Sequence, residues 1–343
     1  MKRTPIVLAV LGLALPLSAL AAPADFTAPG PYPVGMTKLH LTKRSVTTGE
    51  PRVLDTLVWY PAVAGSGTAS PDVLLDADVL AGRWPLIMFS HGSCGTPGQS
   101  PFFTAGLASW GFIVAAPPHP GNTTAEIPAC FGAASTADSF ANRVPDIEFV
   151  IDELLGASAA SEADSPFSHR IDPTRIGMSG HSFGGQTTLR VAAADPRVKA
   201  AVALAPASQG IAGLRIAAPT MILVGERDSL TPFATAARGG FRLLRGPRFL
   251  VEFADTGHCA FTVVCAPEFC GDGCEPNALP LDQAHDLTLR YAVPFFLRYL
   301  RGEAELAREL LPAAAPEGAT VVEAQPNASS VAARQRLRVF DAP

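Results

Sequence analysis

The segment Ile176-Gly177-Met178-Ser179-Gly180-His181-Ser182-Phe183-Gly184 decides the fold of this chain. It begins in an apolar run, and the residues that follow it favour a helix up to Ala194. Gly180 and Gly184 lie two residues before and after Ser182, which is the G-x-S-x-G pattern of a sharp strand-to-helix turn. A β-carbon at either glycine would crowd such a turn, which places the serine hydroxyl at a helix N-terminus. The pattern therefore predicts that Ser182 is a nucleophile.

Apolar runs alternate with helical stretches on both sides of this turn. Uninterrupted apolar strands are typical of a parallel sheet, whose strands are buried on both faces. Apolar residues recur at helical spacing from Ile147 to Leu154, behind Pro145, and from Leu289 to Leu300. This spacing predicts helices that cover the sheet. The predicted parallel strands are 86–89, 112–116, 176–178, 201–204, 221–224 and 249–253.

The chain opens differently, with two strand-forming segments. Residues 37–41 and 54–60 are separated by a polar turn at 47–50, which predicts an antiparallel hairpin. We therefore expect an α/β fold with a mostly parallel twisted sheet, helices on both faces and an N-terminal antiparallel hairpin. The segments 120–142 and 259–281 are long and irregular, and we expect them to border the functional site.

A serine nucleophile needs a histidine to take its proton and a carboxylate to orient that histidine. In proteins with this turn the order along the chain is serine, acid, histidine. His258 follows the strand 249–253, whereas His285, the other downstream histidine, lies in a polar stretch and is expected at the surface. We therefore predict His258 as the base.

The acid is expected in the loop after the strand 221–224. Asp228 lies there, and Glu226 and Asp255 remain as alternatives. Ser179 and Ser93 are weaker candidates for the nucleophile, because neither has glycines on both sides at the required spacing. The predicted triad is therefore Ser182, Asp228 and His258.

Composition excludes several classes of protein. Of the 343 residues, 48% are hydrophobic and 17% are charged, which excludes a disordered chain. A net charge of −5 provides no basic surface for nucleic acid. Residues 1–21 have the pattern of a signal peptide: Lys2 and Arg3 precede an apolar run that is too short for a stable membrane anchor and ends at Ala19-Leu20-Ala21. We expect a secreted or periplasmic protein with a catalytic domain at 22–302 and a loosely held tail at 303–343.

Six cysteines fit an oxidising compartment and predict disulfides. Sequence alone leaves their pairing open, although Cys94 with Cys130 is a plausible bridge at the edge of the site. The close spacing of the others also admits a zinc site, but it lacks the paired C-x2-C pattern. The cysteines are Cys94, Cys130, Cys259, Cys265, Cys270 and Cys274.

Four segments resemble the platelet-activating-factor acetylhydrolases of the plasma and intracellular type II, and the predicted dienelactone hydrolases, within the α/β-hydrolase superfamily. The opening strands 32–41 and 57–62 extend this likeness over most of residues 31–300. The resemblance implies that the main-chain N–H groups of Ser93 and Phe183 form the oxyanion hole and that the His91 side chain is positional. The four segments are FSHGSCG (89–95), LASWGFIVAAPPHPGNT (107–123), DIEFVIDEL (146–154) and RIGMSGHSFGGQ (175–186).

The triad and the resemblance imply a serine hydrolase that cleaves small-molecule or lipid esters through an acyl-enzyme on Ser182. We expect it to be a monomer. Neither a metal nor an organic cofactor is expected. Dienelactone hydrolases proper use a cysteine nucleophile, so the serine here does not imply cleavage of dienelactones. The alternatives are a secreted polyester or cutin-type depolymerase, an acyltransferase that uses the same triad, and an exported binding protein with a degenerate hydrolase fold.

Overall fold

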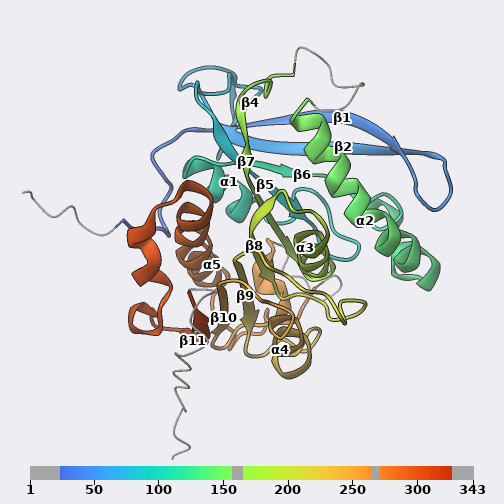
Figure 1. The fold of residues 1–343 in the computed structure, drawn as a ribbon. Helices are drawn as coiled ribbons and strands as arrows, with labels where there is room; N and C mark the ends of the chain where they lie inside the picture. The colour runs from blue at the N-terminus through green and yellow to red at the C-terminus, as the bar shows by residue number, and fades with distance from the viewer. Residues whose placement is uncertain (1–23, 157–164, 264–269, 327–343) are drawn as a thin grey trace, which may run out of the picture.

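One twisted sheet forms the centre of the molecule (Figure 1). The structure is a computed structural model that describes residues 24–156, 165–263 and 270–326. Within these residues the sheet has 11 strands, in the order β11-β10-β9-β8-β7-β5-β6-β2-β1-β4-β3.

The central strands run parallel, as their apolar sequences predict. Pairing between neighbours is parallel from β6 through β5, β7, β8 and β9 to β10. The carboxyl ends of these strands therefore meet at one edge of the sheet, where ligand sites of such folds lie. The strands are β5 (Trp84–Ser90), β6 (Ile113–Ala116), β7 (Ile171–His181), β8 (Val198–Leu204), β9 (Thr220–Gly225) and β10 (Arg248–Phe253).

The N-terminal strands form the predicted hairpin. β1 (Val34–Arg44) and β2 (Pro51–Pro61) pair antiparallel, and β2 pairs antiparallel with β6. Two short strands, β3 (Thr68–Ala69) and β4 (Leu74–Leu75), complete this edge. The predicted α/β fold, with its mostly parallel sheet and antiparallel start, is confirmed.

Helices cover both faces of the sheet and bury a separate apolar layer on each (Figure 1). α2 (Ala133–Leu154), α3 (Phe183–Ala194) and α4 (Arg238–Phe241) lie on one face, and α1 (Pro101–Ser109) and α5 (Leu281–Phe296) lie on the other. Shorter helical turns are η1 (Thr124–Glu126), η2 (Ala129–Phe131), η3 (Phe233–Ala237), η4 (His258–Phe261), η5 (Leu297–Arg301), η6 (Ala304–Leu310) and η7 (Pro312–Ala314).

Helix α2 begins 12 residues before Pro145, the position where the sequence predicted its start. Much of the segment 120–142 is therefore helical rather than irregular. A proline inside a helix removes one backbone hydrogen bond, but the turns before it are held by their side chains. Asn142 accepts the Val46 N–H at 2.9 Å, and Arg143 is fully buried. These tertiary contacts outweigh the preference of Pro145 for the first turn of a helix.

The segment after Gly302 also differs from the predicted loose tail. Residues 304–314 form helical turns, and β11 (Ala319–Gln325) pairs antiparallel with β10. An uncovered β10 would present unpaired backbone groups at the edge of the sheet. The fold therefore continues to at least Gln325. The predicted signal peptide and the last part of the tail lie outside the described residues, within which no helix is long and apolar enough to span a membrane.

Candidate active site

Ser182 occupies a strained turn between β7 and α3. Its backbone has φ 56° and ψ −115°, a conformation that residues with a β-carbon rarely adopt. The flanking glycines are sterically required, because a β-carbon on Gly184 would lie 1.8 Å from the Ser90 carbonyl oxygen and one on Gly180 would lie 2.5 Å from it. The elbow predicted from the sequence is therefore packed directly against the end of β5.

Ser182 lines an apolar cavity. The cavity has a volume of about 390 Å³ and is also lined by His258, Ser93 and Cys94. Exposed apolar side chains surround its mouth. They are Ile127, Phe131, Leu230 and Val263.

The histidine and the carboxylate meet as the sequence predicted. Nδ1 of His258, in η4 after β10, lies 2.9 Å from Oδ2 of Asp228 in the loop after β9, and both residues are buried. The Thr231 hydroxyl donates to the same carboxylate oxygen at 2.7 Å, and the Thr231 N–H donates to the other. An ionised Asp228 makes Nδ1 of His258 the protonated nitrogen, which leaves Nε2 available to accept a proton.

The environment of Asp228 favours its ionised form. Burial by itself raises the pKa of this carboxyl, but the hydrogen bond and charge of His258 and the hydrogen bonds from Thr231 outweigh burial and hold the pKa below its ordinary value. The carboxylate therefore stays charged at neutral pH and can orient the imidazole.

The alternative residues lie in other surroundings. Glu226 accepts the Asp255 N–H, and the exposed Asp255 carboxylate pairs with Arg227. Ser179 is buried in β7, where its hydroxyl donates to the Val202 carbonyl at 2.7 Å. His285, which the sequence placed at the surface, is only partly exposed: its ring stacks on Phe102 at 3.5 Å in the α1–α5 layer.

The two predicted oxyanion donors lie on different elements. Phe183 is the first residue of α3, and N–H groups in a first helical turn have no acceptor within the helix. Ser93 follows β5, and its N–H makes no hydrogen bond within residues 24–156, 165–263 and 270–326. Both N–H groups are therefore free to bind an anion.

A buried polar network supports the loop that contains Ser93. The Arg143 guanidinium donates to the Ser90 hydroxyl and to the carbonyl oxygens of His91 and Gly92. His119 bridges Ser90 and Asp146, with ring nitrogens 2.9 Å from each. Burial lowers the pKa of His119 to about 3, although Asp146 opposes this shift. Ser90, His119 and Asp146 lie in segments that carried the family resemblance, but no motif marked Arg143, which lies before the point at which the helix was predicted to begin.

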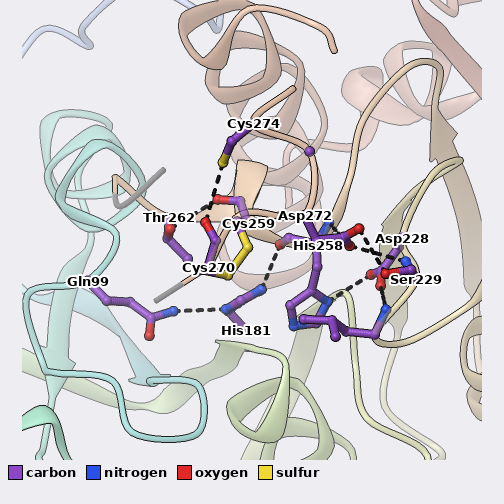
Figure 2. Close-up of a disulfide and its surroundings, with 12 residues drawn as sticks. Gln99, His181, Asp228, Ser229, His258, Cys259, Thr262, Cys270, Asp272 and Cys274 are labelled. Atoms are coloured by element: carbon purple, nitrogen blue, oxygen red, sulfur yellow. Dashed lines mark hydrogen bonds and ion pairs between the residues drawn. A yellow bond between two sulfur atoms is a disulfide. The ribbon is translucent and has the colours of Figure 1, made fainter. Parts of the chain in front are cut away.

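A second chain of hydrogen bonds joins the Ser93 loop to the histidine loop, and Figure 2 shows its part from Gln99 through His181 to His258. Gln99 accepts the Gly92 N–H at 2.9 Å, and its amide nitrogen lies 3.0 Å from Nδ1 of His181. Nε2 of His181 in turn lies 3.0 Å from the His258 carbonyl oxygen. Gln99 therefore donates to His181, and His181 donates to His258. Burial, the largest effect, lowers the pKa of His181 to about 3 and keeps its ring neutral.

Disulfides hold both borders of the cavity. Cys94 pairs with Cys130, one plausible bridge among pairings that the sequence left open, and Cys259 pairs with Cys270 beside His258 (Figure 2). Asp272 follows the second bridge, and its carboxylate accepts the N–H groups of His258 and Ser229. Cys274 is also disulfide-bonded, whereas Cys265 lies outside the described residues.

The sheet order, the serine elbow and the loops after β9 and β10 define an α/β-hydrolase fold. A family model for PET hydrolase-like proteins matches residues 102–265, and one for platelet-activating factor acetylhydrolase, isoform II, matches residues 32–141. A ferulic acid esterase from Streptomyces cinnamoneus has the same fold, with a TM-score of 0.67, 24% identity and coverage of 88% of this chain and 98% of its own. The chain has the α/β-hydrolase fold, and parts of it are similar to PET hydrolase-like proteins and to platelet-activating factor acetylhydrolases of isoform II.

Curated relatives match with moderate identity. Cutinase est2 of Thermobifida alba is 30% identical over 47% of this chain and 47% of its own length. Bis(hydroxyethyl) terephthalate hydrolase of Streptomyces coelicolor is 26% identical over 69% of this chain and 68% of its own. The matched part spans about half the length of the cutinases, between 44% and 51% for three of them.

Proposed function

We propose that this protein is an exported serine hydrolase that cleaves carboxylic esters through an acyl-enzyme on Ser182. The observation that carries the proposal is the placement of Ser182 at a strained elbow, in a cavity shared with a histidine whose Nδ1 is held by Asp228. The similarity to cutinases, to a terephthalate ester hydrolase and to a ferulic acid esterase supports the same chemistry.

In the proposed cycle, Ser182 attacks the ester carbonyl while Nε2 of His258 takes its proton. The N–H groups of Ser93 and Phe183 bind the oxyanion, and His258 then returns the proton to the departing alcohol. Water repeats the steps and releases the acid. Asp228 stabilises the imidazolium that forms in each half of the cycle.

Substrates with an apolar acyl or aryl part fit the cavity best. Its mouth presents exposed Ile127, Phe131, Leu230 and Val263 to solvent, and exposed apolar patches commonly mark binding surfaces. The same surface favours a second candidate function, depolymerisation of a polyester or of cutin. We expect the protein to act outside the cytoplasm, because the structure holds Cys94–Cys130 and Cys259–Cys270 as disulfides. We further propose that it acts as a monomer.

The test is hydrolysis of a graded set of soluble alkyl and aryl esters by the wild type and by Ser182→Ala. We expect turnover by the wild type and loss of at least about 1,000-fold in the folded variant. Release of acid from polyester or cutin films separates the depolymerase from an esterase for soluble substrates. Products formed with added alcohol acceptors detect an acyltransferase. A folded wild type without turnover on any of these substrates favours the binding protein instead.

A further inference from the structure

Among the residues that the structure describes, the peptide between Gly92 and Ser93 has hydrogen-bond partners at its carbonyl oxygen and none at its N–H. Three groups donate to the Gly92 carbonyl oxygen: Nδ1 of His91 at 2.7 Å, Nη2 of Arg143 at 3.1 Å and the Gly95 N–H at 3.2 Å. In a trans peptide the C=O and the following N–H point in opposite directions. Fixing the Gly92 oxygen therefore fixes the direction of the Ser93 N–H.

Arg143 also holds the preceding peptide. Its Nη1 donates to the His91 carbonyl at 2.6 Å, while the N–H of the same peptide, on Gly92, donates to Gln99. The planar guanidinium thus donates to two successive carbonyl oxygens from two nitrogens held at a fixed spacing. Arg143 therefore holds two successive peptides of the loop after β5, together with Gln99 and the His91 ring.

The same guanidinium contacts the second oxyanion residue. Its central carbon lies 4.2 Å from the centre of the Phe183 ring, in the geometry of a cation–π contact. Ser139 and Asn122 accept further hydrogen bonds from it, so that the side chain is fixed in place. Arg143 is fully buried and does not line the cavity, which excludes direct contact with a substrate there.

We propose that Arg143 is a positioning residue that aims the Ser93 N–H at the oxyanion by clamping the His91 and Gly92 carbonyls. This inference rests on the proposed serine hydrolase function and deepens it. Because the oxyanion forms only as the reaction proceeds, loss of the clamp lowers kcat and leaves KM nearly unchanged.

The test compares Arg143→Lys and Arg143→Met with Arg190→Met. Arg190 is the matched control: it packs over the Phe140 ring at 3.7 Å and donates to the Phe140 carbonyl, but it does not contact the loop. We expect kcat to fall about 10- to 100-fold in the Arg143 variants, with KM within about twofold, and to stay within about twofold in the control. A gentler variant, Ser139→Ala, removes one support of Arg143 and is expected to lower kcat about threefold.

Two further readouts separate positioning from general damage. A thionoester places sulfur, a weak hydrogen-bond acceptor, at the oxyanion position, so the ratio of ester to thionoester turnover should fall in Arg143→Lys and not in Arg190→Met. Amide hydrogen exchange of peptides that cover 90–99 should quicken only in the Arg143 variants and in Ser139→Ala.

The inference is overturned if folded Arg143→Lys keeps wild-type kcat, the wild-type turnover ratio and wild-type exchange of the loop. If neither Arg143 variant folds, wild-type kcat and exchange in Ser139→Ala overturn it in the same way. If the wild type hydrolyses no ester, the proposed function fails, whereas exchange of the loop still decides whether Arg143 holds it.

Discussion

At the scale of single residues, the candidate site combines one strained residue with strongly held partners. A positive φ on a residue other than glycine costs on the order of 1–3 kcal/mol and persists only where the surroundings enforce it. At Ser182 the enforcement comes from the close packing of Gly180 and Gly184 on Ser90, which leaves no room for another path of the chain. The strain keeps the hydroxyl at the cavity.

Asp228→Asn tests the orientation of His258. An amide in place of the carboxylate can donate to Nδ1, which favours the wrong tautomer of the imidazole, and we expect kcat to fall about 10,000-fold. Initial rates on a soluble ester measure the change. Asp255→Asn is the control, because this exposed carboxylate forms an ion pair with Arg227, away from His258, and Asn suits its φ of 51°. Equal losses in the two variants would contradict the role given to Asp228.

The sequence predicted these residues because each follows an apolar strand. Ser182, Asp228 and His258 come after three buried runs, and the order of the runs places their carboxyl ends together. Arg143 could not be found in this way. Its partners Ser90 and His91 lie more than 50 positions away, and no local pattern reports that they meet.

At the scale of elements, the site depends on the close approach of α3 to β5. The helix begins directly under the Ser90 carbonyl, and only the missing β-carbon of Gly184 permits this contact. The loop that contains the predicted oxyanion donor Ser93 also begins at the end of β5. Any shift of α3 away from β5 would therefore move the serine and the oxyanion donors apart.

Gly184→Ala should be among the most damaging single methyl additions in the protein. The added carbon would lie 1.8 Å from the Ser90 oxygen, so we expect a loss of at least about 3 kcal/mol in the free energy of unfolding and little remaining turnover. Urea denaturation measures the loss. Gly239→Ala is the matched control, since nothing lies within 4 Å of a β-carbon there, and its stability should change by less than about 1 kcal/mol.

The Cys94–Cys130 bridge closes a loop over a sequence separation of 36 residues. The paired substitution Cys94→Ser with Cys130→Ser should lower the free energy of unfolding by about 4 kcal/mol, because it restores freedom to the unfolded chain. We also expect a lower kcat, since Cys94 follows the oxyanion donor Ser93. Denaturation and ester kinetics on the same sample measure both effects. Unchanged kcat in the folded double variant would show that the bridge does not support the site.

Local patterns predicted the strands of the sheet but not the limits of two other elements. Pro145 predicted a helix start, yet Asn142 and Arg143 hold the turns before it through contacts with distant segments. The residues after Gly302 have no strong strand signal, and β11 exists because β10 offers an open edge. Both differences arise from tertiary contacts, which override local propensity.

At the scale of the whole molecule, three fully buried histidines make stability depend on pH. Burial is the largest effect on each: it lowers the pKa of His119 and His181 to about 3 and that of His91 well below its ordinary value. These rings are neutral in the folded protein but take up protons in the unfolded chain below about pH 6.5. The stability that comes from burying these neutral rings is therefore fully present above about pH 6.5. The free energy of unfolding decreases as the pH falls from there toward 3.

Acidification should accordingly destabilise the protein well before its carboxylates are protonated. Each histidine lowers the free energy of unfolding by about 1.4 kcal/mol per pH unit below about pH 6, and the three together by about 4. Urea denaturation at several values between pH 7.5 and 5 measures the slope. His181→Gln should reduce the slope of the free energy of unfolding against pH by the share of one histidine, about 1.4 kcal/mol per pH unit. A stability that stays constant over this range would contradict the buried neutral state of these rings.

The most direct test of the Ser182 assignment is covalent labelling. The folded wild type and Ser182→Ala are treated with a fluorophosphonate, and the adduct is counted by intact mass and located by peptide mapping. We expect one adduct per wild-type molecule, on Ser182, and none on the variant. Labelling of both proteins to the same extent, or of neither in folded samples, would contradict a serine hydrolase site at this elbow.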